Sequence, residues 1–269
     1  MQKHECGTEL VRINGRTIRS FAEGTLGTQE AKRRFGKSAV TDWVSICPNC
    51  DAYALGVDMK NPCAFLCVDG VMRTMADFDW GSSNTFKSEV LDFYGFKFSK
   101  SALYSSVNAF IEDEETRNAE VIGENLLKNS SPSMALAFSE AVVTWGRGSR
   151  VWGNLKRFHS DNLGEEIDRW VVSVVNAQND EDAIRVGVGI KGLGVSFASK
   201  HLRMLNPEKY AVLDEVLSNG LGIALNEKGY ALFMRLLRDF KEKIGFEYSL
   251  AVLEMGIFNL VRQQVRSIN

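Results

Sequence analysis

Apolar residues in the last two thirds of the chain recur at intervals of three and four positions, which is the spacing of one helix face. The pattern begins near Ser99 and is strongest over Leu232–Ile244 and Leu250–Val261. Two more apolar helices are expected. One begins near Ser130–Ser133 and ends at Gly146–Gly148, and the other runs from about Glu165 and buries Trp170, Val174 and Val175. We therefore expect residues 99–269 to form a helical region.

Residues 1–98 show a different pattern, in which short apolar runs are separated by glycines. Val11–Ile18 alternates loosely, as a strand does, and Ala64–Val68 is a short apolar run. The sequence therefore predicts a mainly α protein with a mixed α/β N-terminal region over residues 1–98.

Composition and charge restrict the kind of protein. The chain has 269 residues, 45% of them hydrophobic, which is enough for a sizeable core in one or two domains. Its formal net charge of −2 argues against a protein that coats a polyanion over its whole surface. A DNA-binding protein of this balance must gather its positive charge on one face.

The first residues, Met1–Cys6, contain no apolar run, and no stretch has the apolar length that a bilayer requires. We therefore expect a cytoplasmic protein whose five cysteines are reduced thiols. Cys47, Cys50, Cys63 and Cys67 have the spacing C-x2-C-x12-C-x3-C, which suits a structural zinc ion. The apolar surroundings of Cys63 and Cys67 fit small buried residues equally well.

Residues 180–205 predict two short helices joined by a tight turn. The first helix is expected from Asp180, as its cap, to Gly187–Gly189, and the second from Val195 to the break at Asn206-Pro207. A glycine turn lets the backbone approach a phosphate, and the amides that open the second helix carry a partial positive charge. The residues expected to form this phosphate-binding turn are Lys191, Gly192, Leu193, Gly194 and Val195.

A Gly-x-Gly turn alone is equally typical of a helix–helix corner without a ligand. Two groups of basic residues favour a DNA-binding face, although each alone is also typical of a solvated surface. One surrounds the turn and the other follows Trp145: the first comprises Arg185, Lys191, Lys200, Arg203 and Lys209, and the second Arg147, Arg150, Lys156 and Arg157.

Residues 180–220 resemble the helix-hairpin-helix DNA glycosylases, which include endonuclease III and the 8-oxoguanine glycosylases. The residues that match the family signature are Ile190, Gly192, Gly194, Ala198 and Asp214, the last after the apolar run Tyr210–Leu213. Lys191 replaces the usual proline. Ser196 stands where members with strand-cleaving activity carry a lysine, and it precedes Asp214 by the family's interval of 18 residues.

The resemblance implies a two-lobed helical fold and a DNA glycosylase that acts on double-stranded DNA containing a modified base. Asp214 is then the catalytic carboxylate, which stabilises the positive charge that develops on the sugar. Ser196 beside it implies a monofunctional enzyme, because a hydroxyl cannot form an imine. Lys200, one helical turn later, is the alternative lysine, although contact with phosphate or solvent is the commoner role.

The extruded base requires an aromatic pocket and a side chain that fills the gap left in the duplex. The candidates surround the turn at Gly146–Gly148 and the last helix, and they are Trp145, Trp152, Arg147, Arg150, Asn154 and Phe258. Packing in the core is the alternative for the three aromatic residues. No catalytic cofactor is expected, and the family's iron–sulfur cluster is excluded because no cysteine follows Asp214.

Several questions stay open at this level. Asp214 has the alternative role of a cap for a helix that begins at Glu215. The resemblance does not define which base is removed. The candidates are oxidised bases, alkylated bases and modified phage bases, and the last would imply a role in antiphage defence. The rival function is a non-catalytic helix-hairpin-helix module that binds DNA. We expect a nucleoid-associated monomer.

Overall fold

The computed structural model describes residues 11–14, 43–47, 52–55, 66–68, 71–73, 88–108 and 114–268. This part of the chain is mainly helical with small sheets, as predicted. It divides into two compact units, Met1–Ala109 together with Arg266–Asn269, and Phe110–Val265. Helix α3 therefore belongs to the first unit, and the predicted boundary after residue 98 stays a prediction.

The first unit contains two sheets and helix α3 (Lys100–Asn108). The antiparallel sheet β1-β2-β3 pairs Val11 with Ile46 and Val44 with Leu55. In the mixed sheet, β4-β5-β7-β6, β5 is parallel to β7 and the other pairs are antiparallel. The strands are β1 (Val11–Asn14), β2 (Trp43–Cys47), β3 (Ala52–Leu55), β4 (Leu66–Val68), β5 (Val71–Arg73), β6 (Val90–Phe93) and β7 (Phe96–Ser99).

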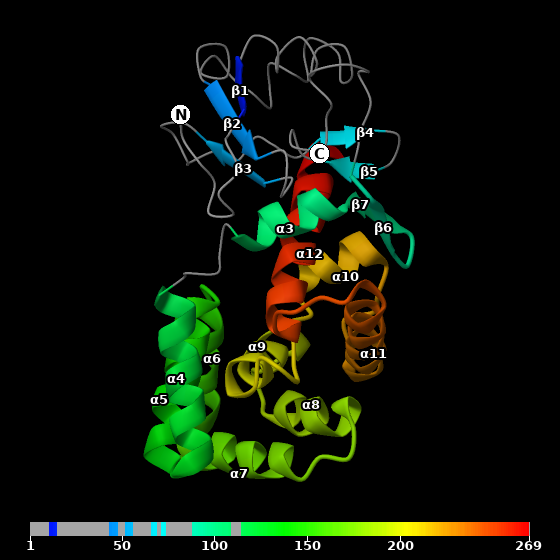
Figure 1. The fold of residues 1–269 in the computed structure, drawn as a ribbon. Coiled ribbons are helices and arrows are strands. Elements are labelled where there is room, and N and C mark those ends of the chain that lie inside the picture. The colour runs from blue at the N-terminus through cyan, green and yellow to red at the C-terminus, as the bar shows by residue number, and fades with distance from the viewer. Residues whose placement is uncertain are drawn as a thin grey trace. The chain divides into compact units, whose positions relative to one another are not determined.

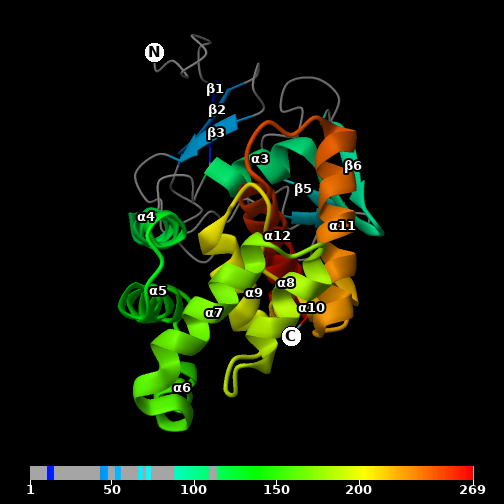
Figure 2. The same ribbon diagram turned by 90° about the horizontal axis from the view of Figure 1, so that it is seen from below.

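The second unit is built from helices. They are α4 (Glu114–Lys128), α5 (Pro132–Trp145), α6 (Ser149–His159), the 3-10 turn η3 (Ser160–Asn162), α7 (Leu163–Val175), α8 (Asp180–Gly189), α9 (Val195–Leu205), α10 (Glu215–Leu221), α11 (Glu227–Ile244) and α12 (Leu250–Ile268). Within this unit, both ribbon views show α4, α5 and α6 on one side of α8 and α9, and α11 on the other side (Figure 1, Figure 2).

The core of the second unit lies between these helices. Its fully buried side chains include Phe138 on α5, Trp170 on α7 and Phe233 on α11. The indole Nε1 of Trp170 donates a hydrogen bond to the carbonyl of Ala183 (2.8 Å), so the one polar atom of this ring is satisfied inside the core. Val175, at the end of α7, was expected to be buried but is 67% exposed because it lies past the apolar face.

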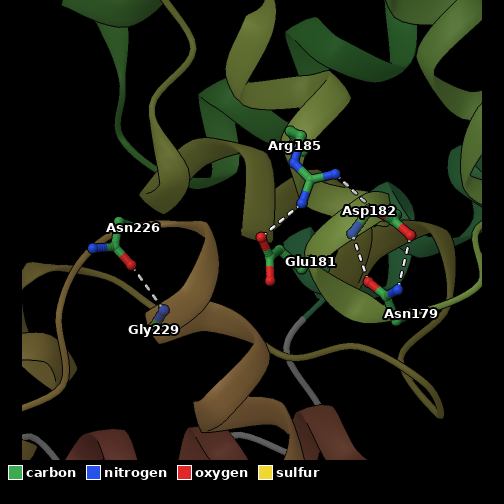
Figure 3. A network of polar contacts seen from close by, with 6 residues as sticks. All are labelled: Asn179, Glu181, Asp182, Arg185, Asn226 and Gly229. Carbon is green, nitrogen blue, oxygen red and sulfur yellow. Dashed lines mark hydrogen bonds and ion pairs between the residues drawn. The ribbon is translucent and has the colours of Figure 1, made fainter.

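Asparagine side chains cap the N-termini of two of these helices, α8 and α11. Asn179 accepts a hydrogen bond from the amide of Asp182 (2.9 Å) at the start of α8, and Asn226 accepts one from Gly229 (2.8 Å) at the start of α11 (Figure 3). The prediction that Asp180 caps α8 is therefore wrong. Asp180 instead forms a bidentate ion pair with Arg238 of α11, with both distances 2.7 Å.

Helices α8 and α9 form the predicted hairpin. The second helix begins at Val195 and ends at Leu205, as expected. Gly192 has φ +99°, a conformation that side-chain-bearing residues rarely adopt, so glycine is required at this turn. Arg185 does not add to the positive charge of the turn as expected, because Glu181 (2.6 Å) and Asp182 (2.7 Å) neutralise its guanidinium (Figure 3).

The predicted zinc ligands are not tested by the structure. Cys50 and Cys63 lie outside the described residues, and Cys47 and Cys67 are described in backbone only. In the described part of the chain, no helix has the length and apolar character that crossing a membrane requires.

Helix α4 crosses α9 so closely that it requires a glycine. A Cβ on Gly123 would collide with the carbonyl oxygen of Met204, a backbone atom that moves only with its helix. We expect Gly123→Ala to lower the free energy of unfolding by about 1–3 kcal/mol, measured by urea denaturation. The matched control is Gly153→Ala on α6, where no atom lies within 4 Å. It should raise the stability by about 1 kcal/mol through helix propensity. Equal effects of the two changes would contradict this account.

Candidate active site

A cavity of about 440 Å³ opens in the second unit. Its walls come from α4, α5 and the turn that follows, α9, the segment before α10, and α12. Charged side chains from α9, the segment before α10 and α12 line it: Lys200, Arg203, Asp214 and Glu254. Glu115 of α4 and Arg147 of the turn after α5 also line it, so five separate segments of the chain contribute ionisable groups to one concave site. This is the arrangement expected of an active site.

Asp214 follows the buried segment Tyr210–Leu213, whose backbone is held in place from several sides. Ser199 of α9 exchanges two hydrogen bonds with the backbone of Leu213, accepting from its amide (3.1 Å) and donating to its carbonyl (3.3 Å). Tyr230 of α11 donates to the carbonyl of Ala211 (3.2 Å). These contacts determine where the Asp214 side chain enters the cavity.

Asp214 is also the N-cap of α10. Its Oδ1 accepts hydrogen bonds from the amides of Val216 (3.0 Å) and Leu217 (3.1 Å). The expectation that Asp214 caps a helix is therefore confirmed, and the helix extends to Leu221. The second carboxyl oxygen makes no hydrogen bond to the described residues. The site therefore offers a carboxyl group with one oxygen available to a ligand.

Lys200 reaches into the cavity from α9, although the residue is only 9% exposed. Its Nζ donates to Ser196 Oγ (3.0 Å) and lies 4.9 Å from the centre of the Phe197 ring. Burial lowers the pKa of Lys200, and the negative charges of Asp214 and Glu254 oppose that shift. A larger fraction of Lys200 side chains is therefore in the neutral, nucleophilic amine form than on an exposed lysine.

Glu254 lies in the wall formed by α12 and is 5% exposed. Its Oε2 accepts a hydrogen bond from the amide of Val212 (3.3 Å). Burial raises the pKa of Glu254 to about 8, against the opposing influence of Arg203. Arg203 itself is engaged by Glu120 of α4 at 2.7 Å, and its side chain is buried. At neutral pH the Glu254 carboxyl group is therefore mainly neutral.

Aromatic side chains form another part of the wall. Trp145, at the end of α5, donates from Nε1 to Thr116 Oγ1 (2.8 Å), and its ring centre lies 5.4 Å from the guanidinium carbon of Arg203. Phe258 lies one helical turn after Glu254 on α12. Arg147 stands at the rim with φ +56° and pairs with Glu115 (3.2 Å). The site thus combines planar apolar surface with a few polar groups.

The hairpin lies against the end of α6. A Cβ on Gly192 would lie 3.3 Å from Phe158, and His159 Nε2 donates to the carbonyl of Lys191 (2.8 Å). The Lys191 ammonium and the Arg157 guanidinium lie 4.4 and 4.6 Å from the centre of the Phe158 ring, which is 39% exposed. A basic and aromatic surface therefore surrounds the turn.

Several cations of this surface are unpaired. Arg150, Lys156, Arg157 and Lys191 form no ion pair with any acidic residue of the described part of the chain. Because cations without an ion pair lose little when an anion binds, these four are better placed to bind a phosphate than the neutralised Arg185.

His201 has a structural role behind the cavity. It is fully buried, and its Nδ1–H donates to the carbonyl of Phe197 (2.7 Å) while Nε2 accepts from Ser139 Oγ (2.9 Å). Burial lowers the pKa of His201 to about 4, so the ring is neutral at physiological pH. This neutral link joins α9 to α5.

The structure brings together part of the set of residues predicted for the site. Those that line the cavity are Asp214, Lys200, Trp145, Arg147 and Phe258. Ser196 lies behind Lys200 as its hydrogen-bond acceptor. The hairpin residues Lys191–Val195 and three residues of α6, Arg150, Trp152 and Asn154, lie outside the lining of the cavity.

Glu254 was not recognised from the sequence. It is an acidic residue in the middle of the apolar repeat of α12, flanked by Leu253 and Ile257, which are fully buried. A charged residue on the buried face of a helix is rare unless it is paired or functional. That exception to the hydrophobic pattern was the available signal.

Comparison of the chain with protein-family models, with curated proteins and with solved structures gives no match. No cluster of histidine, cysteine and carboxylate side chains suited to a metal ion occurs among the residues that the structure describes. The functional interpretation therefore depends on the geometry of the cavity and the hairpin.

Proposed function

We propose that the protein is a DNA glycosylase of the helix-hairpin-helix class, which extrudes a modified nucleotide and hydrolyses its N-glycosidic bond. The observation that carries the proposal is the position of Asp214. Its carboxylate lines a cavity of about 440 Å³ and keeps one oxygen free of hydrogen bonds to the described residues. The aspartate belongs to the segment that directly follows the second hairpin helix.

The hairpin supplies the DNA anchor in this proposal. The backbone hydrogen bonds of α9 begin with the amides of Phe197 and Ala198, both donated to the carbonyl of Gly194. The amide of Leu193 in the turn donates to the carbonyl of Ile190 (2.9 Å), and Leu193 is buried, so it is not the phosphate ligand that was expected. The amides of Gly194, Val195 and Ser196 make no hydrogen bond to the described residues and are the ones that can bind a phosphate. The unpaired cations of α6 and Lys191 add sequence-independent affinity for the backbone.

The cavity supplies the pocket for the extruded base. Its volume lies within the roughly 300–1,000 Å³ typical of ligand sites. Trp145 and Phe258 offer planar surfaces for a base, and Glu254, Lys200 and Arg203 offer polar groups that can recognise its edges.

Asp214 supplies the electrostatic part of the reaction. Positive charge develops on the sugar as the bond between C1′ and the base nitrogen lengthens, and an adjacent carboxylate stabilises that charge. The free oxygen of Asp214 is also suited to orient the water that attacks C1′.

Replacement of Asp214 by asparagine tests the proposal, because asparagine is an equally good helix cap and should preserve α10. We expect Asp214→Asn to reduce base release at least ~100-fold while DNA affinity stays nearly unchanged. The measurement is mass spectrometry of bases freed from a panel of oxidised, alkylated and phage-modified duplexes. Asp239→Asn, on the exposed face of α11, is the matched control and should retain full activity.

Two results would contradict the proposal. Base release that persists in the Asp214→Asn variant would remove this carboxylate from the chemistry. DNA binding without release of any base from the panel by the wild-type protein would favour the non-catalytic helix-hairpin-helix module.

A second candidate, a glycosylase that also cleaves the strand, is favoured by the position of Lys200. Its amine lies in the cavity with Asp214, and burial lowers its pKa. A neutral amine can attack C1′, displace the base and form an imine with the opened sugar. Ser196, which stands at the family's lysine position, makes a hydrogen bond to this amine.

Borohydride trapping distinguishes the two candidates. If Lys200 is the nucleophile, borohydride reduces the imine to a stable protein–DNA adduct with wild-type protein. Lys200→Met should give none, whereas the control Lys243→Met, at an exposed position of α11 outside the cavity lining, should still be trapped. Base release without a trapped adduct would establish the monofunctional reaction and retire the lysine mechanism.

A further inference from the structure

Glu254 is a buried carboxyl group for which the mechanism above has no chemical role. It lines the same cavity as Asp214 but comes from α12. The hydrogen bond from the Val212 amide (3.3 Å) is the one that its carboxyl makes to the described residues. The carboxyl therefore has oxygen lone pairs, or a proton, to offer to a molecule in the cavity.

The surroundings of Glu254 contain charges of both signs. Lys200 and Arg203 come from α9, and Asp214 stands before α10. Glu115, Arg147 and Arg262 also line the cavity, from α4, the turn after α5 and α12. Arg203 forms its contact ion pair with Glu120 rather than with Glu254. Glu254 therefore lacks a contact partner that would stabilise its ionised form.

The two carboxyl groups of the cavity differ in how they are solvated. Asp214 is half-buried and receives two amide hydrogen bonds, whereas Glu254 is almost fully buried and receives one long one. Burial raises the pKa of Glu254 to about 8, and the nearby charge of Asp214 contributes to the same direction. A buried carboxyl group that keeps its proton at neutral pH is suited to act as an acid beside a second, better solvated carboxyl group in the same cavity.

We propose that Glu254 is the general acid of the reaction, donating its proton to the leaving base while Asp214 stabilises the sugar. This inference depends on the proposed glycosylase function and adds a role for a second residue in the same cavity.

The step balances as a hydrolysis. The C1′–N bond breaks and its electron pair leaves with the base, which takes the proton from the Glu254 carboxyl. A water molecule adds to C1′, and the proton that it loses returns to the Glu254 carboxylate. The products are the free base and an abasic sugar, and both carboxyl groups return to their starting state.

The role of Glu254 limits the class of base. A neutral base leaves poorly as an anion and benefits from a proton, whereas a base alkylated to a cation leaves without one. We therefore expect neutral oxidised or otherwise modified bases, rather than cationic alkylated ones, to be the substrates.

The pH dependence of single-turnover base release tests the proton donor. In the wild-type enzyme the rate should fall as the pH rises through about 8, because Glu254 loses its proton there. Glu254→Gln keeps the shape and a hydrogen-bond donor but has no proton to transfer. It should lower the rate at pH 7 by about 10²–10⁴-fold and abolish the fall at high pH. Glu254→Asp should restore part of the rate, and Glu247→Gln, an exposed control, should behave as wild type.

The pH dependence of stability tests the same carboxyl without any substrate. The pKa of Glu254 is about 8 in the folded protein against an ordinary value of 4.5, so between these two pH values the folded state binds a proton that the unfolded chain has lost. Stability due to Glu254 is therefore present at low pH and lost as the pH rises to about 8. The urea midpoint of Glu254→Gln relative to wild type should rise across this window, and a constant difference would overturn the proposal.

The outcomes separate the two proposals. If the wild-type protein frees no base, or if Asp214→Asn remains active, the glycosylase function fails and this inference fails with it. If wild-type protein frees a base and Glu254→Gln does so at the same rate with the same fall at high pH, only the general-acid role is overturned.

Discussion

The hydrogen bonds that hold the buried segment Tyr210–Leu213 are the constraint on which the rest of the site depends. Ser199 attaches this segment to α9, Tyr230 attaches it to α11, and the Val212 amide reaches Glu254 on α12. The segment is fully or nearly fully buried, so each of its backbone groups needs a partner inside the protein. The partner on α9 is Ser199, next to Lys200 in the sequence, and the partner on α12 is Glu254 itself. The hydrogen bonds that satisfy this buried backbone therefore also hold the walls of the cavity together.

The two ends of α9 are suited to different tasks in this arrangement. At its start, the amides of Gly194, Val195 and Ser196 make no hydrogen bond to the described residues, and this end is the proposed phosphate site. Its later turns are buried and carry Lys200, His201 and Arg203 toward α5 and the cavity. Because both lie on one rigid helix, the distance between the proposed DNA anchor and the proposed reacting groups is constant. A catalytic site requires reacting groups held on rigid elements in this way.

Local signals in the sequence predicted the hairpin and the cap of α10, since glycine turns, caps and helix breaks depend on neighbouring residues. These local signals could not predict interactions between segments that are far apart in the sequence. The ion pair between Asp180 and Arg238 displaced the expected cap, and Glu181 and Asp182 neutralised Arg185, which the charge pattern had assigned to the DNA-binding face. Lys200 appeared as an alternative because helical spacing places it near Ser196, but its burial depends on the turn at Gly146–Gly148. The place of Glu254 in the cavity depends on how α12 packs within the second unit. The apolar periodicity of α12 predicts a buried face but not the helices that this face contacts.

The proposed function depends most directly on one position, that of the Asp214 carboxyl group beside the sugar of an extruded nucleotide. A duplex with a pyrrolidine in place of one deoxyribose carries a positive charge that imitates the reacting sugar, whereas a tetrahydrofuran site is neutral. Comparing the two affinities tests the claim without knowledge of the base. The account predicts that wild-type protein binds the cationic duplex about 10–100-fold more tightly, as a charge-assisted hydrogen bond implies, and that Asp214→Asn loses this preference. Equal affinities for the two duplexes in the wild-type protein would contradict it.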